Sequence, residues 1–155
     1  MPLGVVATDL RSGVGVLFQR GDTATAVRAS SAVPAIFQPV SIAGRDYVDG
    51  GLVSPIPVSY AKKMGAELII AVDVSSNPEG KDAQDTLQIL MQTFAIMGKS
   101  INTYELLGAD IVVKPLMTGL ASASFSSRLD AIQFGRQAMT LQLPALHRMI
   151  DAKSK

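Results

Sequence analysis

The run 67-ELIIAVDV-74 constrains the fold more than any other stretch of this chain. It is almost wholly apolar and rich in β-branched residues, and it lacks the alternation of apolar and polar residues that is typical of a half-exposed strand. A run of this kind predicts a strand covered on both faces, as in a parallel sheet packed between helices. The later stretch 110-DIVVKP-115 predicts a second short strand of the same kind.

Two helices are predicted around that second strand. Apolar side chains recur every three or four residues from Leu87 to Tyr104, which predicts the longest helix of the chain, ending at Gly108. Ser127 and an aspartate three residues later have the spacing of a capping box, which predicts a last helix that Pro144 interrupts. Because strands alternate with helices, residues 1–155 are expected to form one α/β domain with a mixed, largely parallel sheet flanked by helices.

The first 65 residues carry the signals of two β-hairpins and two short helices. Four strands are predicted, at residues 5–8, 14–18, 40–42 and 47–48. Asp22 can cap a helix that runs to about residue 32 and ends before Pro34. Pro57 suits the first turn of another helix, which is expected to stop at Gly65.

Composition excludes several classes of function. The formal net charge is +1 and Lys and Arg do not cluster, so nucleic acid is not an expected partner. With no cysteine and a single histidine, the chain can form neither a disulfide nor a zinc site of several thiolates or imidazoles, and no metal or cofactor is predicted. No apolar run reaches the roughly 18 residues that a membrane span needs, and a secretory signal is not recognisable, so a cytoplasmic or membrane-peripheral location is expected.

The stretch 45-RDYVDGGLVSPIPV-58 contains the most informative polar residue, Asp49. Asp-Gly is a common turn dipeptide, so an ordinary β-turn is one interpretation. The other is a catalytic carboxylate at the end of a strand, with Gly50 or Gly51 at positive φ to allow a sharp turn. Asp9 and Asp73 also follow apolar strands, where aspartate is an ordinary terminator as well as a candidate ligand-binding residue.

Three segments in this order resemble the C-terminal half of bacterial patatin-like phospholipases: 27-VRASSAVPAIFQPV-40, 46-DYVDGGLVSPIPV-58 and 65-GAELIIAVDVS-75. Residues 5–22 are similar to the strand pair that precedes these segments in the family, and residues 132–146 are similar to its terminal helix. Members of the family are serine lipid acyl hydrolases of α/β architecture. The resemblance covers nearly the whole chain and implies a patatin-like fold from which the N-terminal half of the domain is absent.

The resemblance implies hydrolysis of acyl lipid esters by a Ser-Asp dyad, with Asp49 as the aspartate and Gly50 and Gly51 completing its motif. A carboxylate within hydrogen-bonding reach of a serine can take the hydroxyl proton as the serine attacks an ester. The family's serine stands in a G-x-S-x-G turn, which does not occur in these 155 residues, and neither does its glycine-rich oxyanion loop. We therefore expect this chain to need the N-terminal half as a partner, or to self-associate.

The resemblance also implies that Ser31, Pro34 and Phe37 line an acyl pocket, although packing in the core would explain the same residues. The expected substrate is an acyl lipid or another ester, met in solution or in peripheral contact with a membrane. The alternative function is a non-catalytic α/β remnant that binds a partner chain or lipid. A nucleotide-binding domain would need a phosphate loop, and the chain has none.

Overall fold

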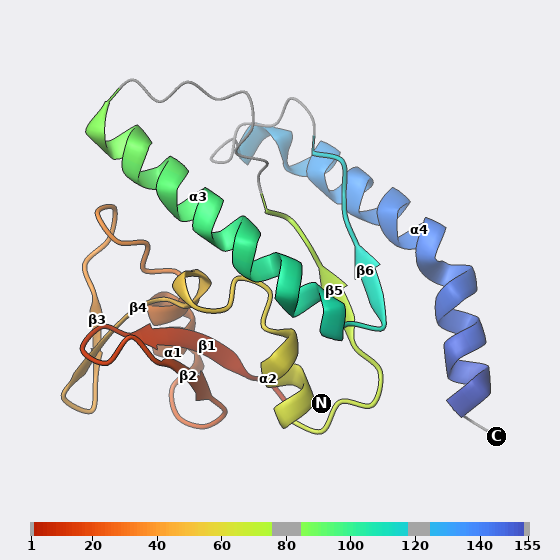
Figure 1. Cartoon of the computed structure of the whole chain (residues 1–155), viewed down its shortest axis with the longest axis horizontal. Helices are drawn as coiled ribbons and strands as arrows, with labels where there is room; N and C mark the ends of the chain where they lie inside the picture. Colours follow the sequence, from red (N-terminus) through yellow and green to blue (C-terminus); the bar gives the residue numbers. More distant parts are fainter. Residues whose placement is uncertain (1, 76–84, 118–124, 154–155) are drawn as a thin grey trace. The chain divides into compact units, whose positions relative to one another are not determined.

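The computed structural model describes residues 2–75, 85–117 and 125–153 (Figure 1). The chain divides into two compact units, residues 1–67 with 75–108 and residues 68–74 with 109–155. Both units combine strands with helices, so the predicted α/β class is confirmed.

The first unit contains two β-hairpins and three α-helices. Its elements are β1 (Val5–Asp9), β2 (Gly15–Phe18), α1 (Thr23–Ser30), β3 (Val40–Ile42), β4 (Arg45–Asp49), η1 (Gly50–Leu52), α2 (Val58–Lys63), α3 (Thr86–Glu105) and η2 (Leu106–Gly108). The four strands form one antiparallel sheet in the order β2-β1-β4-β3. Both predicted hairpins are confirmed, and the two hairpins are joined by the pairing of β1 with β4 at the centre of the sheet.

Local signals account for the turns and helix ends of this unit. Ala43 and Gly44 have φ values of 50° and 76°, which is the geometry of a two-residue turn between twisted strands. The Asp22 carboxylate accepts a hydrogen bond from the Thr25 amide at 2.8 Å and so begins α1, as predicted. Gly65 follows α2 at a φ of 86°, a conformation that favours glycine.

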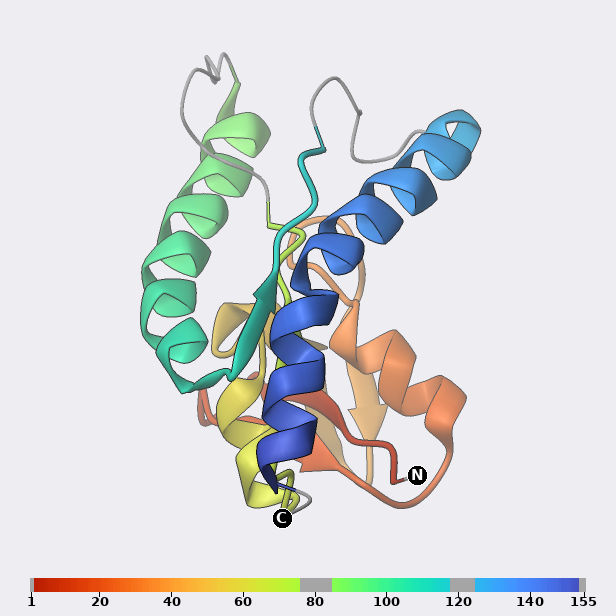
Figure 2. The same cartoon turned by 90° about the vertical axis from the view of Figure 1, so that its right-hand side faces the viewer.

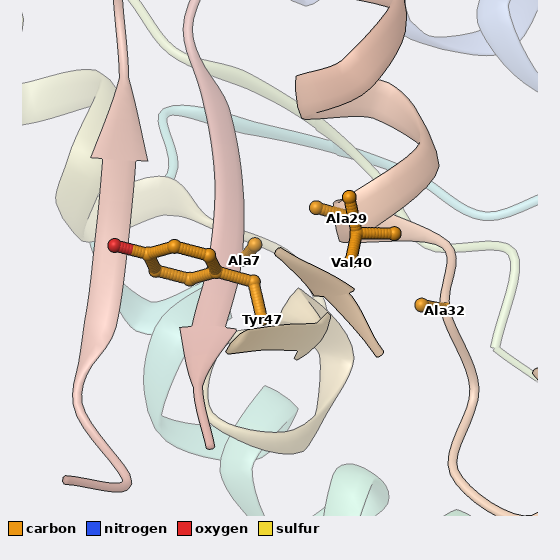
Figure 3. Packing of buried hydrophobic residues seen from close by; sticks show 5 residues of the cluster. All are labelled: Ala7, Ala29, Ala32, Val40 and Tyr47. Atoms are coloured by element: carbon orange, nitrogen blue, oxygen red, sulfur yellow. The ribbon is translucent and has the colours of Figure 1, made fainter. Parts of the chain in front are cut away.

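Helix α1 packs on the sheet through small side chains (Figure 3). The buried cluster consists of Ala7, Ala29, Ala32, Val40 and Tyr47. The Tyr47 ring also meets Phe18 edge to face, with ring centroids 5.1 Å apart. Because three of the five buried residues are alanines, the backbone of α1 can approach the sheet closely.

The second unit contains β5 (Ile70–Val72), β6 (Ile111–Val113), η3 (Phe125–Ser127) and α4 (Arg128–Lys153). Strands β5 and β6 pair in parallel, with Ala71 opposite Val112. Helix α4 lies along β6 (Figure 2), where Ala138 packs against the two outer residues of that strand. Both strands that the sequence predicts in this region are therefore present.

The structure corrects several expectations about these elements. Parallel pairing is confined, among the described strands, to β5 and β6, so the sheet is not largely parallel. Strand β5 is not covered on both faces, because Ile70 and Val72 are 40% and 52% exposed while Ala71 is buried. The longest described helix is α4 with 26 residues, against 20 for α3, and α4 continues through Pro144 without a break.

Helix α3 also differs from expectation in the side chains it buries. Leu87, Met97 and Tyr104 from the predicted apolar stripe are 49%, 53% and 77% exposed. The buried residue of α3 is instead the polar Asn102. The regular helix ends at Glu105, and the 3₁₀ turn η2 carries the chain on to Gly108.

Candidate active site

Asp49 is the last residue of β4, as the sequence predicts for a residue at the exit of the second hairpin. It pairs with Ala7 of the neighbouring strand β1. Its amide donates a hydrogen bond to the Ala32 carbonyl at 3.0 Å, and its carbonyl accepts one from the Thr8 hydroxyl at 2.8 Å. The backbone of Asp49 is therefore fixed by contacts with α1 and β1 as well as by its own strand.

One oxygen of the Asp49 carboxylate is held by a hydrogen bond, and the other can accept a proton or a hydrogen bond. Oδ1 accepts a hydrogen bond from the Gly51 amide at 2.7 Å and so caps the 3₁₀ turn η1. Oδ2 accepts no hydrogen bond from the residues that the structure describes. Partial burial raises the pKa of Asp49, and the hydrogen bond from Gly51 opposes that rise. A carboxylate with a raised pKa is a stronger base, and its available oxygen is the one that can take a proton.

The two glycines after Asp49 do not have the positive φ that the sequence predicts, and close neighbours explain them instead. The glycines with positive φ are at positions 13, 21, 44 and 65 of the described chain, so neither Gly50 nor Gly51 has that conformation. A Cβ atom on Gly50 would instead lie 2.1 Å from the Val6 carbonyl oxygen. A Cβ atom on Gly51 would lie 3.0 Å from Oδ1 of Asp49. Glycine is therefore required at position 50 by the backbone of β1, whereas a side chain at position 51 would only crowd the Asp49 carboxylate.

Glu105 anchors the loop that follows the Asp-Gly-Gly motif, a role that the sequence does not suggest. Its Oε1 accepts hydrogen bonds from the hydroxyls of Ser54 and Ser59 at 2.8 and 3.0 Å. Its Oε2 accepts one from the Ser59 amide at 3.0 Å, near the start of α2. Pro57, the N-cap residue of α2, has no side-chain hydrogen bond, so a carboxylate from a distant helix satisfies this helix end instead. Glu105 thus ties α3 to the loop that follows the Asp-Gly-Gly motif.

The predicted acyl-pocket residues are only partly brought together. Ser31 and Phe37 line a cavity of about 400 Å³ between the end of α1 and β3, whereas Pro34 is not among its lining residues. The other described lining residues are Arg28, Ala32, Gln38, Pro39, Val40 and Ser41. Ala32 connects the cavity to the candidate base, because its carbonyl accepts the hydrogen bond from the Asp49 amide.

The two serines at the end of α1 are engaged in local hydrogen bonds. The Ser30 hydroxyl donates to the Val6 carbonyl at 2.7 Å, and the Ser31 hydroxyl donates to the Val27 carbonyl at 2.9 Å. Neither serine is hydrogen-bonded to Asp49. Both hydroxyls are therefore engaged with backbone carbonyls.

Two further aspartates that end strands have local structural partners. The buried Asp9 carboxylate accepts hydrogen bonds from Arg45 at 2.7 Å and from the Ser12 amide at 2.8 Å. The Ser12 amide, followed by the Ser12 hydroxyl and Arg45, lowers the pKa of Asp9 against the opposing effect of burial. Asp73 is buried and pairs with Lys114 at 2.9 Å. These contacts give Asp9 a structural role in its turn and pair Asp73 with a lysine of the same unit.

The described residues contain neither a membrane-spanning helix nor a group of side chains placed to hold a metal ion. No helix within residues 2–75, 85–117 and 125–153 is long and apolar enough to cross a bilayer. The same residues contain no group of three or more acidic or histidine side chains placed to hold a metal ion. His147, the single histidine of the chain, is exposed on α4.

The first part of this chain is similar to a known protein family. Residues 5–62 match the model of the family described as patatin-like phospholipase. The match includes the Asp-Gly-Gly motif and the end of α1, whereas the residues after 62 lie outside it.

Curated relatives are similar over short segments. An uncharacterised NTE-family protein of Mycobacterium tuberculosis is 40% identical over 86 residues, which are 54% of this chain and 24% of the relative. The lysophospholipase NTE1 of Meyerozyma guilliermondii is 34% identical over 70 residues, covering 45% of this chain and 5% of that protein. The uncharacterised protein YjjU of Escherichia coli is 40% identical over 47 residues, or 30% of this chain and 13% of YjjU.

The matched part of this chain thus spans about a quarter of the first relative and less of the other two. The family match and these relatives support the same assignment as the ordered motifs at the end of α1 and after β4. Residues 5–62 of this chain, with Asp49 among them, are similar to the patatin-like phospholipase family.

Proposed function

We propose that this chain supplies the general base, Asp49, for the hydrolysis of acyl lipid esters by a Ser-Asp dyad. The serine and the oxyanion-binding loop come from a segment outside these 155 residues, because the chain contains no G-x-S-x-G turn. The family suggests a lipid hydrolase, and one relative is named a lysophospholipase.

The observation that carries this proposal is the state of the Asp49 carboxylate. Oδ1 is held by the Gly51 amide, while Oδ2 accepts no hydrogen bond from the described residues. Partial burial raises the pKa of the group, which strengthens it as a base. A carboxylate that only stabilised a turn would gain nothing from an unengaged oxygen in a partly desolvated position.

The proposed reaction has two steps in which Asp49 moves one proton. The incoming serine hydroxyl transfers its proton to Oδ2 as the serine oxygen attacks the ester carbonyl carbon. The protonated Asp49 then gives that proton to the leaving alcohol, and an acyl-serine remains. Water repeats the sequence, because it loses a proton to Asp49 as it attacks the acyl-serine, and the serine recovers that proton when the fatty acid leaves.

The cavity beside the end of α1 is the proposed acyl site. Ser31 and Phe37 line it, and Ala32 connects it to Asp49 through one backbone hydrogen bond. Pro34 contributes indirectly in this proposal, because it lies in the turn where the amides of Ile36 and Phe37 both donate to the Val33 carbonyl. Its fixed φ would help to hold Phe37 at the cavity.

The direct test is Asp49→Asn in a protein that includes the G-x-S-x-G segment. Asparagine is nearly the same size and can still accept the Gly51 hydrogen bond, so the fold should be retained. Hydrolysis of a short-chain nitrophenyl ester should fall by about 10³-fold, the scale expected for an essential base. The matched control is Asp46→Asn, an exposed position on the same strand, which should stay within about twofold of the parent. An Asp49→Asn enzyme as active as this control would remove Asp49 from the mechanism.

The chain by itself should not hydrolyse esters, because a base without a nucleophile cannot form an acyl intermediate. A serine-directed fluorophosphonate probe should therefore leave it unlabelled, and covalent labelling of any serine would refute the proposed division of roles. We also propose that the chain binds the segment carrying the nucleophile, or else self-associates. Light scattering should then report complexes or oligomers. A monodisperse monomer that does not bind the added segment would contradict this proposal.

A non-catalytic binding module is the second candidate function. The exposed apolar side chains favour it, with Ile70 and Val72 on β5 and Ile96 and Met97 on α3 between 40% and 53% exposed. This alternative requires that the protein with the G-x-S-x-G segment hydrolyse no ester at all, so turnover by the parent in the assay above would exclude it.

A further inference from the structure

The orientation of the Asp49 carboxylate depends on a short turn that begins with glycines. Oδ1 accepts the hydrogen bond from the Gly51 amide at 2.7 Å, and that amide belongs to the three-residue 3₁₀ turn η1. Gly50 and Gly51 open this turn, and glycine restricts the backbone less than other residues do. Short 3₁₀ turns also have poorer hydrogen-bond geometry than α-helices. The direction of the carboxylate therefore depends on the contacts that fix η1 from outside.

Hydrogen bonds link η1 to helix α3 through Ser54. The Gly50 carbonyl accepts hydrogen bonds from the amides of Val53 and Ser54 at 3.1 and 2.9 Å, which close the turn. The hydroxyl of the same Ser54 donates to Oε1 of Glu105 at 2.8 Å. Ser54 is 4% exposed, so water has little access to replace this acceptor. Glu105 is thus joined to the Asp49 carboxylate through Ser54 and the glycines of η1.

Glu105 is itself held firmly enough to fix the turn. Its carboxylate accepts hydrogen bonds from the Ser54 hydroxyl and from both the hydroxyl and the amide of Ser59. Asn102 lies one turn earlier on the same side of α3 and is buried, but its side-chain amide has no hydrogen-bond partner in the described chain. Glu105, and not Asn102, therefore supplies the polar contact between this part of α3 and the loop.

Glu105 can affect Asp49 through position but not through charge. Burial raises the pKa of Asp49 and the hydrogen bond from Gly51 lowers it, and no charged residue of the described chain contributes. The contact by which Glu105 can act on the carboxylate is therefore the one from the Gly51 amide, which η1 orients.

We propose that Glu105 is a positioning residue for Asp49. By holding Ser54 it fixes η1, so that the Gly51 amide keeps Oδ1 in place and leaves Oδ2 to accept the serine proton. The proposal rests on the proposed function, because it explains how the base of the same site is oriented. A displacement of about 1 Å can cost about 10²-fold in rate, so a residue that touches neither substrate nor serine can still govern turnover.

The first test uses this chain alone and follows the Gly51 amide proton by NMR during an acid titration. In the parent this resonance should move as Asp49 becomes protonated, because the hydrogen bond to Oδ1 weakens. Glu105→Ala should reduce the movement by about half or more, since hydrogen bonds weaken steeply when their alignment is lost. Glu105→Gln keeps an oxygen that can accept from Ser54 and should retain most of the movement.

A matched pair of serine variants separates positioning from a general loss of stability. Ser54→Ala and Ser59→Ala each remove one hydrogen bond to Oε1 of Glu105. Of the two serines, Ser54 is the one bonded to the Gly50 carbonyl. Ser54→Ala should therefore reproduce the effect of Glu105→Ala on the Gly51 amide, whereas Ser59→Ala should behave as the parent does. Circular dichroism checks that both are folded, so this comparison decides the matter even if Glu105→Ala does not fold.

The second test measures ester hydrolysis by the protein that includes the G-x-S-x-G segment. Glu105→Ala and Ser54→Ala should each lower kcat by about 10- to 100-fold and leave KM within about twofold, because the base is displaced while the lining of the acyl cavity is unchanged. Glu105→Gln should recover most of the loss in kcat. A purely structural role would not separate Ser54→Ala from Ser59→Ala.

Equal responses of the Gly51 amide in Ser54→Ala and Ser59→Ala would overturn the proposal. So would a parent chain in which this amide does not follow the titration of Asp49. If Asp49→Asn is inactive while Glu105→Ala turns over as the parent does, only the positioning by Glu105 is refuted. If Glu105→Ala reduces the Gly51 response while Asp49→Asn stays active, the role of Asp49 as the base is refuted and the link from Glu105 to its carboxylate stands.

Discussion

Gly50→Ala tests the reason why the residue after Asp49 is glycine. The added Cβ atom would lie 2.1 Å from the Val6 carbonyl oxygen and 2.8 Å from its carbonyl carbon. Ordinary contacts of a Cβ atom begin at 3.4 Å, so the shorter contact must lengthen by about 1.3 Å, which is 3.4 minus 2.1. The atoms that must move belong to the backbone of β1, an inner strand bonded on both sides, and cannot rotate away as a side chain would.

We expect Gly50→Ala to lower the free energy of unfolding by about 3 kcal/mol, the upper part of the usual range for overpacking. For a chain of this size that corresponds to a melting temperature about 10 °C lower, measured by circular dichroism. Gly13→Ala separates the effect of φ, because Gly13 has a φ of 71° in open space and alanine there should cost about 1 kcal/mol. Gly135→Ala meets nothing within 4 Å in α4 and should stabilise that helix by up to about 1 kcal/mol.

Two outcomes would contradict this explanation: a Gly50→Ala protein that melts within about 2 °C of the parent, or one that loses no more stability than Gly13→Ala. Either result would mean that β1 gives way easily and that the close approach does not explain the glycine.

Three further substitutions test the anchoring and titration of this region. Glu105→Ala should lower the free energy of unfolding in urea by about 2–3 kcal/mol, because the buried Ser54 hydroxyl loses its acceptor. Glu105→Gln should recover part of this loss, and equal losses in the two variants would contradict a hydrogen-bonding role. Asp49→Asn should raise the melting temperature near pH 7, because folding raises the pKa of Asp49 above its ordinary value of 3.8. The ionised carboxylate therefore destabilises the folded state, and this loss of stability grows as the pH rises from 3.8 through the pKa of the folded state. Melting below pH 3.8 should show no such gain, and a gain independent of pH would refute the assignment. Asp9→Asn should lower the melting temperature near pH 7, because folding lowers the pKa of Asp9 below its ordinary value of 3.8. The ionised carboxylate stabilises the fold above pH 3.8, and this stabilisation is lost as the pH falls through the pKa of the folded state. An equal loss of stability in acid and near neutral pH would contradict this assignment.

The elements that the sequence predicts correctly are those with local signals. The Ala43-Gly44 turn, the capping by Asp22 and the stop at Gly65 each depend on a few adjacent residues. The position of Asp49 at the end of a strand was predictable for the same reason. The family assignment depended on the order of several such motifs along the chain.

The parts that could not be predicted depend on pairs that are far apart in the sequence. The need for glycine at position 50 comes from Val6, 44 residues earlier, and becomes visible only when β1 pairs with β4. Glu105 reaches Ser54 across 51 residues, and neither residue has a local pattern that suggests the contact. Arg28 and Ser41 come together only when α1 packs beside β3.

The apolar run 67-ELIIAVDV-74 misled in a different way. Its composition predicts burial on both faces, but a strand buries its second face only when another element covers it. In the structure Ala71 is buried while Val72 is 52% exposed, so the run alternates in burial although it does not alternate in polarity. Composition reports what a strand can bury, and the number of neighbouring elements determines what it does bury.

The inner position of β4 has a consequence for hydrogen exchange at the candidate base. Sheets open locally from their edges, which in the first unit are β2 and β3. The Asp49 amide, however, donates to the Ala32 carbonyl just beyond the end of α1, so it reaches solvent only when that segment separates from the sheet. Its exchange rate should therefore report the opening of the α1–β4 contact itself. A lipid or partner chain that tightens this region would slow that single amide, and the change could be followed without any catalytic turnover.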